Sequence, residues 1–332
     1  MDSLTQIALG IATAELCAGD KLGRRTFLYG AVLGTLPDLD VVIGKLFLDP
    51  VSGVAIHRGL SHSLFLFMAI APLLGRIITR IEKGRISLPH ASTLAFWCLL
   101  THVMLDMFTS WGTQAFWPLS YRIAFKTIFV VDPLYTLPLL ICIIIAWRKR
   151  EFNFRRKYIL RGIYISSAYL LLTCGIKLYA LQKFTDALEK QNISYSGLIV
   201  KPTAFNCILW NANIETEDAY LLGNYSLFDS QSITFRRYQK NEEFAKELAR
   251  NRDFQTLEGV SEGWYIITKK DGLYYFNDLR FGLLNDDPLH PQFAFSYVFK
   301  DENGILKAYE APRQKRDGKK LMEGILERIG GN

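Results

Sequence analysis

The chain has 332 residues, of which half are apolar and 21% are charged, and its formal net charge is +7. The apolar share is high for a soluble protein and low for a pure transporter, and the length allows two domains. The positive charge does not indicate nucleic acid as a partner, because Lys and Arg of the first half concentrate in short loops between apolar segments, as membrane topology requires.

The first 182 residues are predicted to form a helical, multi-pass membrane domain. Six segments are expected to enter or cross the bilayer: 4–19, 26–46, 60–80, 91–109, 127–147 and 158–181. The last two have the roughly 20 residues that a spanning helix needs. The second segment is interrupted by Pro37, Asp38 and Asp40, which is typical of a break that lines a polar cavity. We expect no cleaved signal peptide, because the start of the chain lacks a basic region followed by a cleavage site.

Basic residues fix the predicted orientation of this domain. They cluster between the first and second segments, between the third and fourth, and between the fifth and sixth. Since basic loops stay in the cytoplasm, both the start of the chain and everything after residue 182 are predicted to lie on the other side. The chain is therefore expected in a membrane, with the lipid bilayer as its first partner.

Residues 183–332 are predicted to form an extracytoplasmic, β-rich (α+β) domain. Runs that mix aromatic or β-branched residues with polar ones indicate strands at 200–209, 219–228, 232–238, 263–268, 273–276 and 293–299. Short helices are expected at 241–251 and 319–329. No known motif lies in this domain, and His290 is assigned no role.

Polar motifs crowd the edges of the apolar segments within the first 133 residues. They are Pro37-Asp38-Leu39-Asp40, His57-Arg58-Gly59-Leu60-Ser61-His62-Ser63, His102 to Asp106, Thr109-Ser110-Trp111-Gly112-Thr113 and Asp132-Pro133. With basic loops inside, all of them fall at the outer membrane face. Ionisable groups at membrane depth are functional-site candidates, and Asp with His is the ligand set of hydrolytic metal sites. The five cysteines form no CxxC pair, so a cysteine zinc site is not expected.

Two pairs of residues carry most of this signal. His102 and Asp106 are four residues apart, which stacks them on one helical face. Both can bind one metal, or one can bind it while the other hydrogen-bonds that ligand. A buried pair that bonds only to itself and its neighbours, without a metal, explains the spacing equally well. Asp38 and Asp40 flank a leucine, so both carboxylates can point into one cavity if the helix is broken. A helix cap accounts for one of these aspartates but not for both.

The remaining candidates lie in two other motifs. His57 and His62 approach one point if a helix begins near Ser61, which is then its N-cap. Arg58 offers a fork of donors that suits a phosphoryl group. Asp132 has two readings of equal weight, a metal ligand and the start of the fifth segment.

Taken together and in this order, the motifs resemble the YdjM-type inner-membrane proteins, which are predicted metal-dependent hydrolases. The resemblance covers about residues 1–140 and includes the opening Met1-Asp2-Ser3-Leu4-Thr5-Gln6. This family is grouped with zinc-dependent phospholipase C and nuclease P1-like enzymes, and the resemblance therefore implies a helical metal site and phosphoester chemistry. Many relatives carry His where this chain has Gln6, so we expect a weakened or different ligand shell there.

We therefore predict a membrane-bound, metal-dependent hydrolase of a phosphoester or lipid-linked substrate at the outer face. One or more divalent ions, zinc first, are expected on a subset of Asp40, His57, His62, His102, Asp106 and Asp132. Catalytic roles are expected for Asp38, Arg58 and Asp106. The alternative is a transporter or ion-binding membrane module that uses the same cluster. A metal site requires convergence at one point, whereas a pathway strings polar groups across the membrane.

Overall fold

The computed structural model describes residues 1–284, 291–312 and 318–332, so His290 lies outside the described residues. The chain divides into two compact units. The helical unit comprises Met1–Val42, Ile56–Gly175 and Ala204–Asn206. The second unit comprises Ile43–Ala55, Ile176–Thr203 and Cys207–Asn332. The predicted boundary at 182/183 falls inside one continuous helix, α8 (Phe152–Lys190), so the division does not follow two contiguous stretches of sequence.

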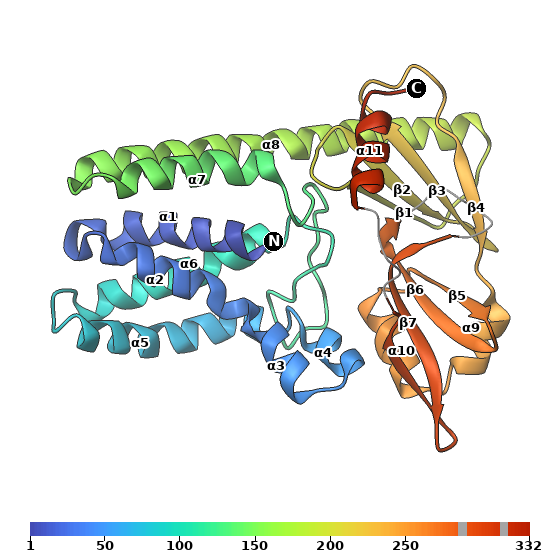
Figure 1. The fold of residues 1–332 in the computed structure, drawn as a ribbon, viewed down its shortest axis with the longest axis horizontal. Helices are drawn as coiled ribbons and strands as arrows, with labels where there is room; N and C mark the ends of the chain where they lie inside the picture. Colours follow the sequence, from blue (N-terminus) through green and yellow to red (C-terminus); the bar gives the residue numbers. More distant parts are fainter. Residues whose placement is uncertain (285–290, 313–317) are drawn as a thin grey trace. The chain divides into compact units, whose positions relative to one another are not determined.

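The helical unit is built from helices whose axes run nearly parallel and side by side (Figure 1). Its elements are α1 (Ser3–Leu22), α2 (Arg25–Thr35), η1 (Leu36–Asp38), η2 (Leu60–His62), α5 (Leu64–Ile81), α6 (Leu88–Asp106), α7 (Pro133–Trp147) and the first part of α8. The helix α3 (Leu39–Phe47) starts in this unit, and α4 (Pro50–Ile56) ends in it.

Four helical stretches among the described residues are long and apolar enough to cross a membrane. They are Arg25–Phe47, Leu64–Ile81, Leu88–Asp106 and Phe152–Lys190. All six predicted segments contain helix, but α1 does not reach this standard and α7 has only 15 residues. The prediction of a spanning helix from residue 127 was wrong at its start, because α7 begins at Pro133, immediately after its cap, Asp132.

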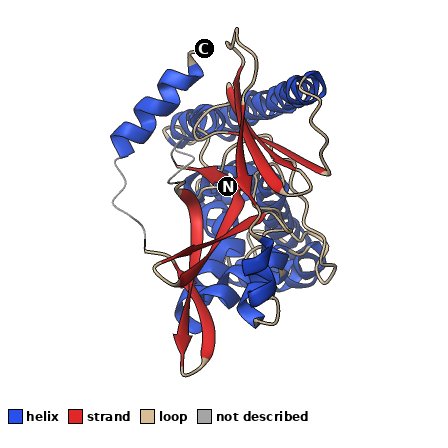
Figure 2. Ribbon diagram, turned by 90° about the vertical axis from the view of Figure 1, so that its right-hand side faces the viewer, coloured by secondary structure: helices blue, strands red, loops and turns tan. Residues whose placement is uncertain are grey.

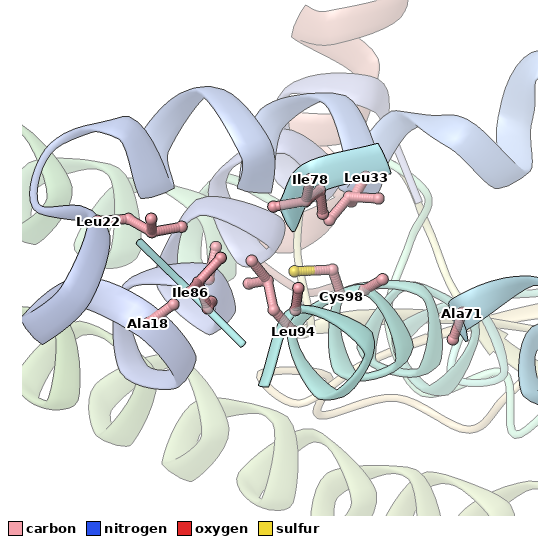
Figure 3. Packing of buried hydrophobic residues seen from close by; sticks show 11 residues of the cluster. Ala18, Leu22, Leu33, Ala71, Ile78, Ile86, Leu94 and Cys98 are labelled. Atoms are coloured by element: carbon pink, nitrogen blue, oxygen red, sulfur yellow. The ribbon is translucent and has the colours of Figure 1, made fainter. Parts of the chain in front are cut away.

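Glycines let α1 and α2 approach closely. A Cβ atom at Gly10 would lie 2.2 Å from the Gly30 carbonyl oxygen, and one at Gly34 would lie 2.6 Å from the Gln6 carbonyl oxygen. Only glycine permits this backbone contact. The apolar core beside it gathers residues of α1, α2, α5 and α6, including Ala18, Leu33 and Cys98 (Figure 3). This packing fixes the backbone that carries the polar motifs.

The second unit contains two four-stranded antiparallel meanders (Figure 2). The first is β1 (Gly197–Pro202), β2 (Leu209–Glu215), β3 (Ala219–Ser226) and β4 (Phe235–Gln239), and Ile214 pairs with Leu198 and with Leu221. The second is β5 (Tyr265–Lys270), β6 (Leu273–Leu283), β7 (Phe293–Glu302) and β8 (Ile305–Glu310). Its register shifts between Asp278 and Leu283 of β6. The unit also holds α9 (Glu242–Leu248), α10 (Arg252–Val260) and α11 (Gly318–Ile329).

The prediction of a soluble, β-rich region is confirmed, with differences in its elements. The strand predicted at 200–209 was wrong, because β1 ends at Pro202 and the next strand begins only at Leu209. Proline has no backbone N–H for a ladder, which favours an end there. Three elements were not predicted: β2 beyond Leu209, β8 and the helix α10.

Helices cover both sheets of the second unit. Phe184 and Leu188 near the end of α8 are fully buried against Trp210 and other residues of the first sheet. On the second sheet, α9 and α10 form a core with Phe276 and Phe299. Val51 of α4 joins this core at 2% exposure, which is why residues 43–55 belong to the second unit.

Candidate metal centre

Four side chains of the helical unit converge on one buried point. Asp38 ends η1, His62 ends η2, and His102 and Asp106 lie on the last turns of α6. Both histidine Nε2 atoms lie 3.5 Å from Asp38 Oδ1, and they lie 3.3 Å (His62) and 3.7 Å (His102) from Asp106 Oδ2. Around a tetrahedral ion with bonds of about 2.0–2.1 Å, neighbouring ligand atoms lie about 3.3 Å apart. The observed spacings are close to that value.

The hydrogen bond of His102 leaves its other nitrogen free for an ion. Nδ1 lies 2.7 Å from the carbonyl oxygen of Gly34, which can only accept. Nδ1 therefore carries the hydrogen, and in the neutral ring Nε2 presents a lone pair to the centre. The close packing of α1 on α2 at Gly34 thus sets the orientation of a residue on α6.

A relay of hydrogen bonds orients His62 in the same way. The Ser61 hydroxyl donates its one hydrogen to Asp40 Oδ2 at 2.6 Å, because a carboxylate can only accept. The Ser61 hydroxyl oxygen also lies 2.9 Å from His62 Nδ1 and must accept a hydrogen bond from it. His62 Nε2 is then the lone-pair nitrogen. Carboxylate-to-histidine contacts of this kind orient ligands in metal sites.

Three of the four converging atoms have no hydrogen-bond partner among the described residues. His62 Nε2, His102 Nε2 and Asp106 Oδ2 are all buried and lack a hydrogen-bond partner there. With both rings neutral, two imidazole lone pairs face carboxylate oxygens in a buried space, an arrangement that a bound cation would stabilise.

A second group of potential ligands shares Asp38 with the first. It consists of Asp38, Asp40 and His57. His57 Nδ1 lies 3.1 Å from Asp40 Oδ1, and burial lowers the pKa of His57, which favours the neutral ring that a metal binds. Asp40 Oδ2 already accepts from Ser61 and from the backbone N–H of Arg58. Its contacts are those of a carboxylate that positions its neighbours.

Arg58 adopts a backbone conformation that its residue type rarely takes. Its φ is 58°, in the left-handed region. The hydrogen bond from its N–H to Asp40 and the one from Gln114 N–H to its carbonyl hold this conformation. The buried guanidinium donates to Thr109 Oγ1 at 2.9 Å, and its Nε lies 2.9 Å from Asp106 Oδ2 without hydrogen-bond alignment. Strain held in this way is concentrated at functional sites.

The second oxygen of Asp106 is held from another direction. Oδ1 accepts from the amino group of Met1 and, at 2.9 Å, from Gln6 Nε2. Gln6 Nε2 also donates to the His102 carbonyl oxygen at 3.2 Å. Gln6 therefore positions one ligand and the backbone of another. Gln6 thus contacts the residues of the centre at a position where the resemblance implies a histidine.

The structure gives Asp132, a predicted ligand, another role. Asp132 lies in neither group of potential ligands found among the described residues. Its Oδ1 accepts from the backbone N–H groups of Leu134 and Tyr135, and its Oδ2 accepts from the Tyr169 hydroxyl at 2.9 Å. These bonds make it the N-cap of α7, the other of the two readings.

Three contributors to the centre were not recognised in the sequence. Ser61 was read as an N-cap, but no capping bond is found, and its hydroxyl links Asp40 to His62. The Gly34 carbonyl and the Thr109 hydroxyl hold His102 and Arg58. Asp38, predicted to be catalytic, lies among the potential ligands of both groups. Ser61 and Thr109 lie in two of the polar motifs, which were the available signals for their contacts, whereas no motif marked the Gly34 carbonyl.

Comparison with known proteins places the helical unit in a family. A family model described as YdjM inner membrane protein matches residues 1–184, more than half of the chain. The chain belongs to the YdjM family. It is also similar to the uncharacterized protein YfhP of Bacillus subtilis (strain 168), with 26% identity over 239 residues, 67% of this chain and 68% of that protein. That similarity covers more of the chain than the YdjM match does. No solved structure matches significantly.

Proposed function

We propose that this YdjM-family protein is a membrane-bound, metal-dependent hydrolase that acts on a phosphoester or a lipid-linked substrate. The observation that carries the proposal is the convergence of His62 Nε2, His102 Nε2 and carboxylate oxygens of Asp38 and Asp106, without a hydrogen-bond donor for the nitrogens among the described residues. Two imidazoles with two carboxylates suit zinc, which accepts nitrogen and oxygen ligands in tetrahedral geometry.

A divalent ion in this position would acidify water and neutralise charge on a phosphoryl oxygen. The chain's own groups supply the rest. The Arg58 guanidinium beside Asp106 is suited to hold a phosphoryl oxygen. With His62, His102 and Asp106 as the three protein ligands of the ion, Asp38 would stay free to act as a base. It is the most exposed of the four converging side chains, at 17%, and is best placed to accept a proton from the attacking water. The water oxygen bonds to phosphorus, the phosphorus–oxygen bond to the alcohol breaks, and the alcohol leaves with a proton.

A transporter that uses the same cluster makes a different prediction about convergence. An ion pathway distributes polar side chains across the membrane. Here the ligand atoms of Asp38, His62, His102 and Asp106 all lie within 4.8 Å of one another. This closeness favours the hydrolase. A hydrolase also turns over in detergent, where no gradient exists, and a transporter does not.

The decisive experiment measures metal and turnover on the same sample. The full chain is purified in detergent, its metal content is determined by elemental analysis, and it is then assayed on a panel of phospholipids, prenyl phosphates and water-soluble phosphoesters. We expect at least one zinc per chain, and hydrolysis that stops with a chelator and returns with zinc. A protein that binds metal but cleaves none of the panel would refute the hydrolase proposal.

We also propose that the metal centre and the second unit lie on the extracytoplasmic side of a bacterial inner membrane. Membership in an inner-membrane family supports the location, and the alternation of basic loops supports the orientation. Reporter fusions at residue 185 test it. A fusion that is active only in the cytoplasm would reverse the orientation.

A further inference from the structure

The segment between α6 and α7 is packed directly on the residues that carry the metal centre. Gln114 N–H donates to the Arg58 carbonyl, and the Leu64 N–H donates to the Ala115 carbonyl, both at 2.9 Å. Thr113 and Ile123 pair as a short antiparallel bridge that closes the segment. Figure 1 shows it as a long loop at one end of the helices. We call residues 113–125 the docking loop.

The docking loop exposes large apolar side chains although it adjoins a polar centre. Leu119 is 63% exposed and Tyr121 is 73% exposed, and Phe116 and Trp117 are also exposed. The segments that bear the potential ligands also expose large apolar side chains. Leu39, between Asp38 and Asp40, is 43% exposed, and Leu60, two residues before His62, is 47% exposed. Large exposed apolar side chains on the segments that bear or contact the potential ligands suit a substrate that carries hydrocarbon.

This apolar surface continues the bilayer-facing side of a spanning helix. The Phe116 ring lies 6.5 Å from the ring of Phe65, in the first turn of α5. Phe65 and Met68, one turn apart on α5, are both more than half exposed, and α5 is long and apolar enough to span. Trp and Tyr beside such a helix are typical of the membrane–water interface. The surface therefore leads from hydrocarbon to the metal centre.

We infer that the docking loop binds the hydrocarbon chain of a lipid phosphoester whose headgroup reaches the centre, so that the substrate is a membrane lipid and not a soluble ester. This inference rests on the proposed hydrolase function. The lipid chain would lie against Leu119, Tyr121 and Trp117, while its phosphate would meet Arg58. Removing apolar contact from the loop should then weaken binding of long-chain substrates only.

The test compares matched substrates and matched variants of the full chain. The substrate pairs share a headgroup and differ in chain length: dioleoyl and dibutyroyl phosphatidate, and undecaprenyl and dimethylallyl phosphate. The loop variant is Leu119→Ser with Tyr121→Ser. The control variant, Tyr164→Ser with Leu171→Ser, removes the same two side-chain types from α8 at 79% and 73% exposure.

We expect the long-chain member of a pair to be preferred. The loop variant should raise its KM at least about 10-fold, equivalent to about 1.4 kcal/mol, and leave kcat and the short-chain KM unchanged. The control variant should change neither. Equal KM values within each pair, or an equal effect of the two variants, would overturn the lipid inference while leaving the hydrolase in place.

A second readout does not require activity. A nitroxide label at Leu119→Cys, in a cysteine-free background and in phosphatidylglycerol vesicles, reports whether the loop contacts hydrocarbon. We expect the label to be more accessible to oxygen than to a water-soluble nickel complex. The reverse order would overturn the inference, even if no substrate of the panel were cleaved and the hydrolase proposal had failed separately.

Discussion

The helical unit contains two buried clusters of charged side chains, and they differ in how their hydrogen bonds are satisfied. In the first, Glu15 of α1 faces Arg155 of α8, and both are at most 1% exposed. In the second, Asp106 faces His62 and His102 with similar burial. Burial is thus alike in the two clusters and does not separate them.

Every described contact of the first cluster joins a donor to an acceptor. Arg155 Nε donates to Glu15 Oε1 at 2.8 Å, and its other nitrogens donate to the carbonyls of Gly19 and Arg150. Thr26 Oγ1 donates to Glu15 Oε2 at 2.5 Å. In the second cluster, the Nε2 atoms of His62 and His102 have no hydrogen-bond partner among the described residues. A buried charge that is fully paired holds helices together, whereas converging ligand atoms without a partner form a possible metal site.

The largest expected effect comes from removing a ligand in the second cluster. His102→Ala should remove bound metal and lower hydrolysis by more than about 100-fold, because losing even an outer partner of a ligand costs about 10- to 100-fold. Folding should persist, since the change costs one hydrogen bond, from Nδ1 to the Gly34 carbonyl, and removes no backbone pairing. Elemental analysis and the phosphoester assay measure both effects. His90→Ala, an exposed histidine bonded to Ser87, is the control. Full metal content in His102→Ala would contradict the assignment.

The first cluster should respond through stability alone. Arg155→Met leaves Glu15 buried without its partner, which should lower the free energy of unfolding by about 3–5 kcal/mol. The metal content of the folded fraction should not change. Chemical unfolding in detergent, followed by metal analysis, tests both statements. The double variant Glu15→Gln/Arg155→Met should recover much of the loss. A fall in metal content in the folded single variant would break the distinction between the clusters.

Arg58 should separate substrate binding from metal binding within the second cluster. Arg58→Ala should retain metal, because a guanidinium does not ligate it, and should lower phosphoester turnover by about 100- to 1000-fold. Arg58→Lys keeps the charge without the planar fork and should recover only part of the activity. Kinetics and metal analysis of both variants provide the measurement. Loss of metal in Arg58→Ala would show that Arg58 acts on the ligands and not on the substrate.

The relay through Ser61 should have a smaller effect. Ser61→Ala breaks the link from Asp40 to His62 and should weaken zinc affinity by about 10- to 100-fold. Titration calorimetry with zinc measures the change. Ser63→Ala is a matched control, because the Ser63 hydroxyl donates to the Trp117 carbonyl at 3.0 Å and not to a ligand. Equal affinities of the two variants would remove Ser61 from the centre.

The smallest effect concerns a third ion pair, in the second unit, which is less buried than either cluster. Arg328 of α11 bonds Asp229 at 2.5 and 2.6 Å. Burial opposes the charge on Asp229, yet the bonds and charge of Arg328 outweigh it and lower the pKa of this carboxyl. The pair should therefore stabilise α11 fully above about pH 4, the usual range of the free group, and less as pH falls through the lowered pKa.

Asp229→Asn should accordingly reduce the protection of α11 by about 1 kcal/mol at neutral pH, a value typical of accessible pairs. Hydrogen exchange of the α11 amides in the full chain measures this protection. The protection of the variant and of the natural chain should become equal in acid. A constant difference across the pH range would show that the contact does not depend on the charge of Asp229.

The sequence predicted elements whose signal is local. Apolar runs located the helices of residues 1–182, and runs of aromatic or β-branched residues mixed with polar ones located most strands of the second unit. The four-residue spacing of His102 and Asp106 placed both on one face of α6, where the structure has them. Local patterns failed where two local readings compete. Asp132 before Pro133 fits both a ligand and a helix cap, and only the position of the α7 start decides between them.

The sequence by itself therefore determined that this chain has apolar helices, a β-rich region and a set of Asp and His residues suited to a metal. Only the tertiary structure decided which of these residues meet. Asp38, His62 and Asp106 are far apart along the chain, and Ser61 reaches Asp40 across 21 residues. Their convergence depends on the close approach of α1 to α2 and on the docking of α6 beside them. Side-chain periodicity fixes which residues share a face of one helix. It does not show which side chains of distant segments meet, because that depends on how the helices pack.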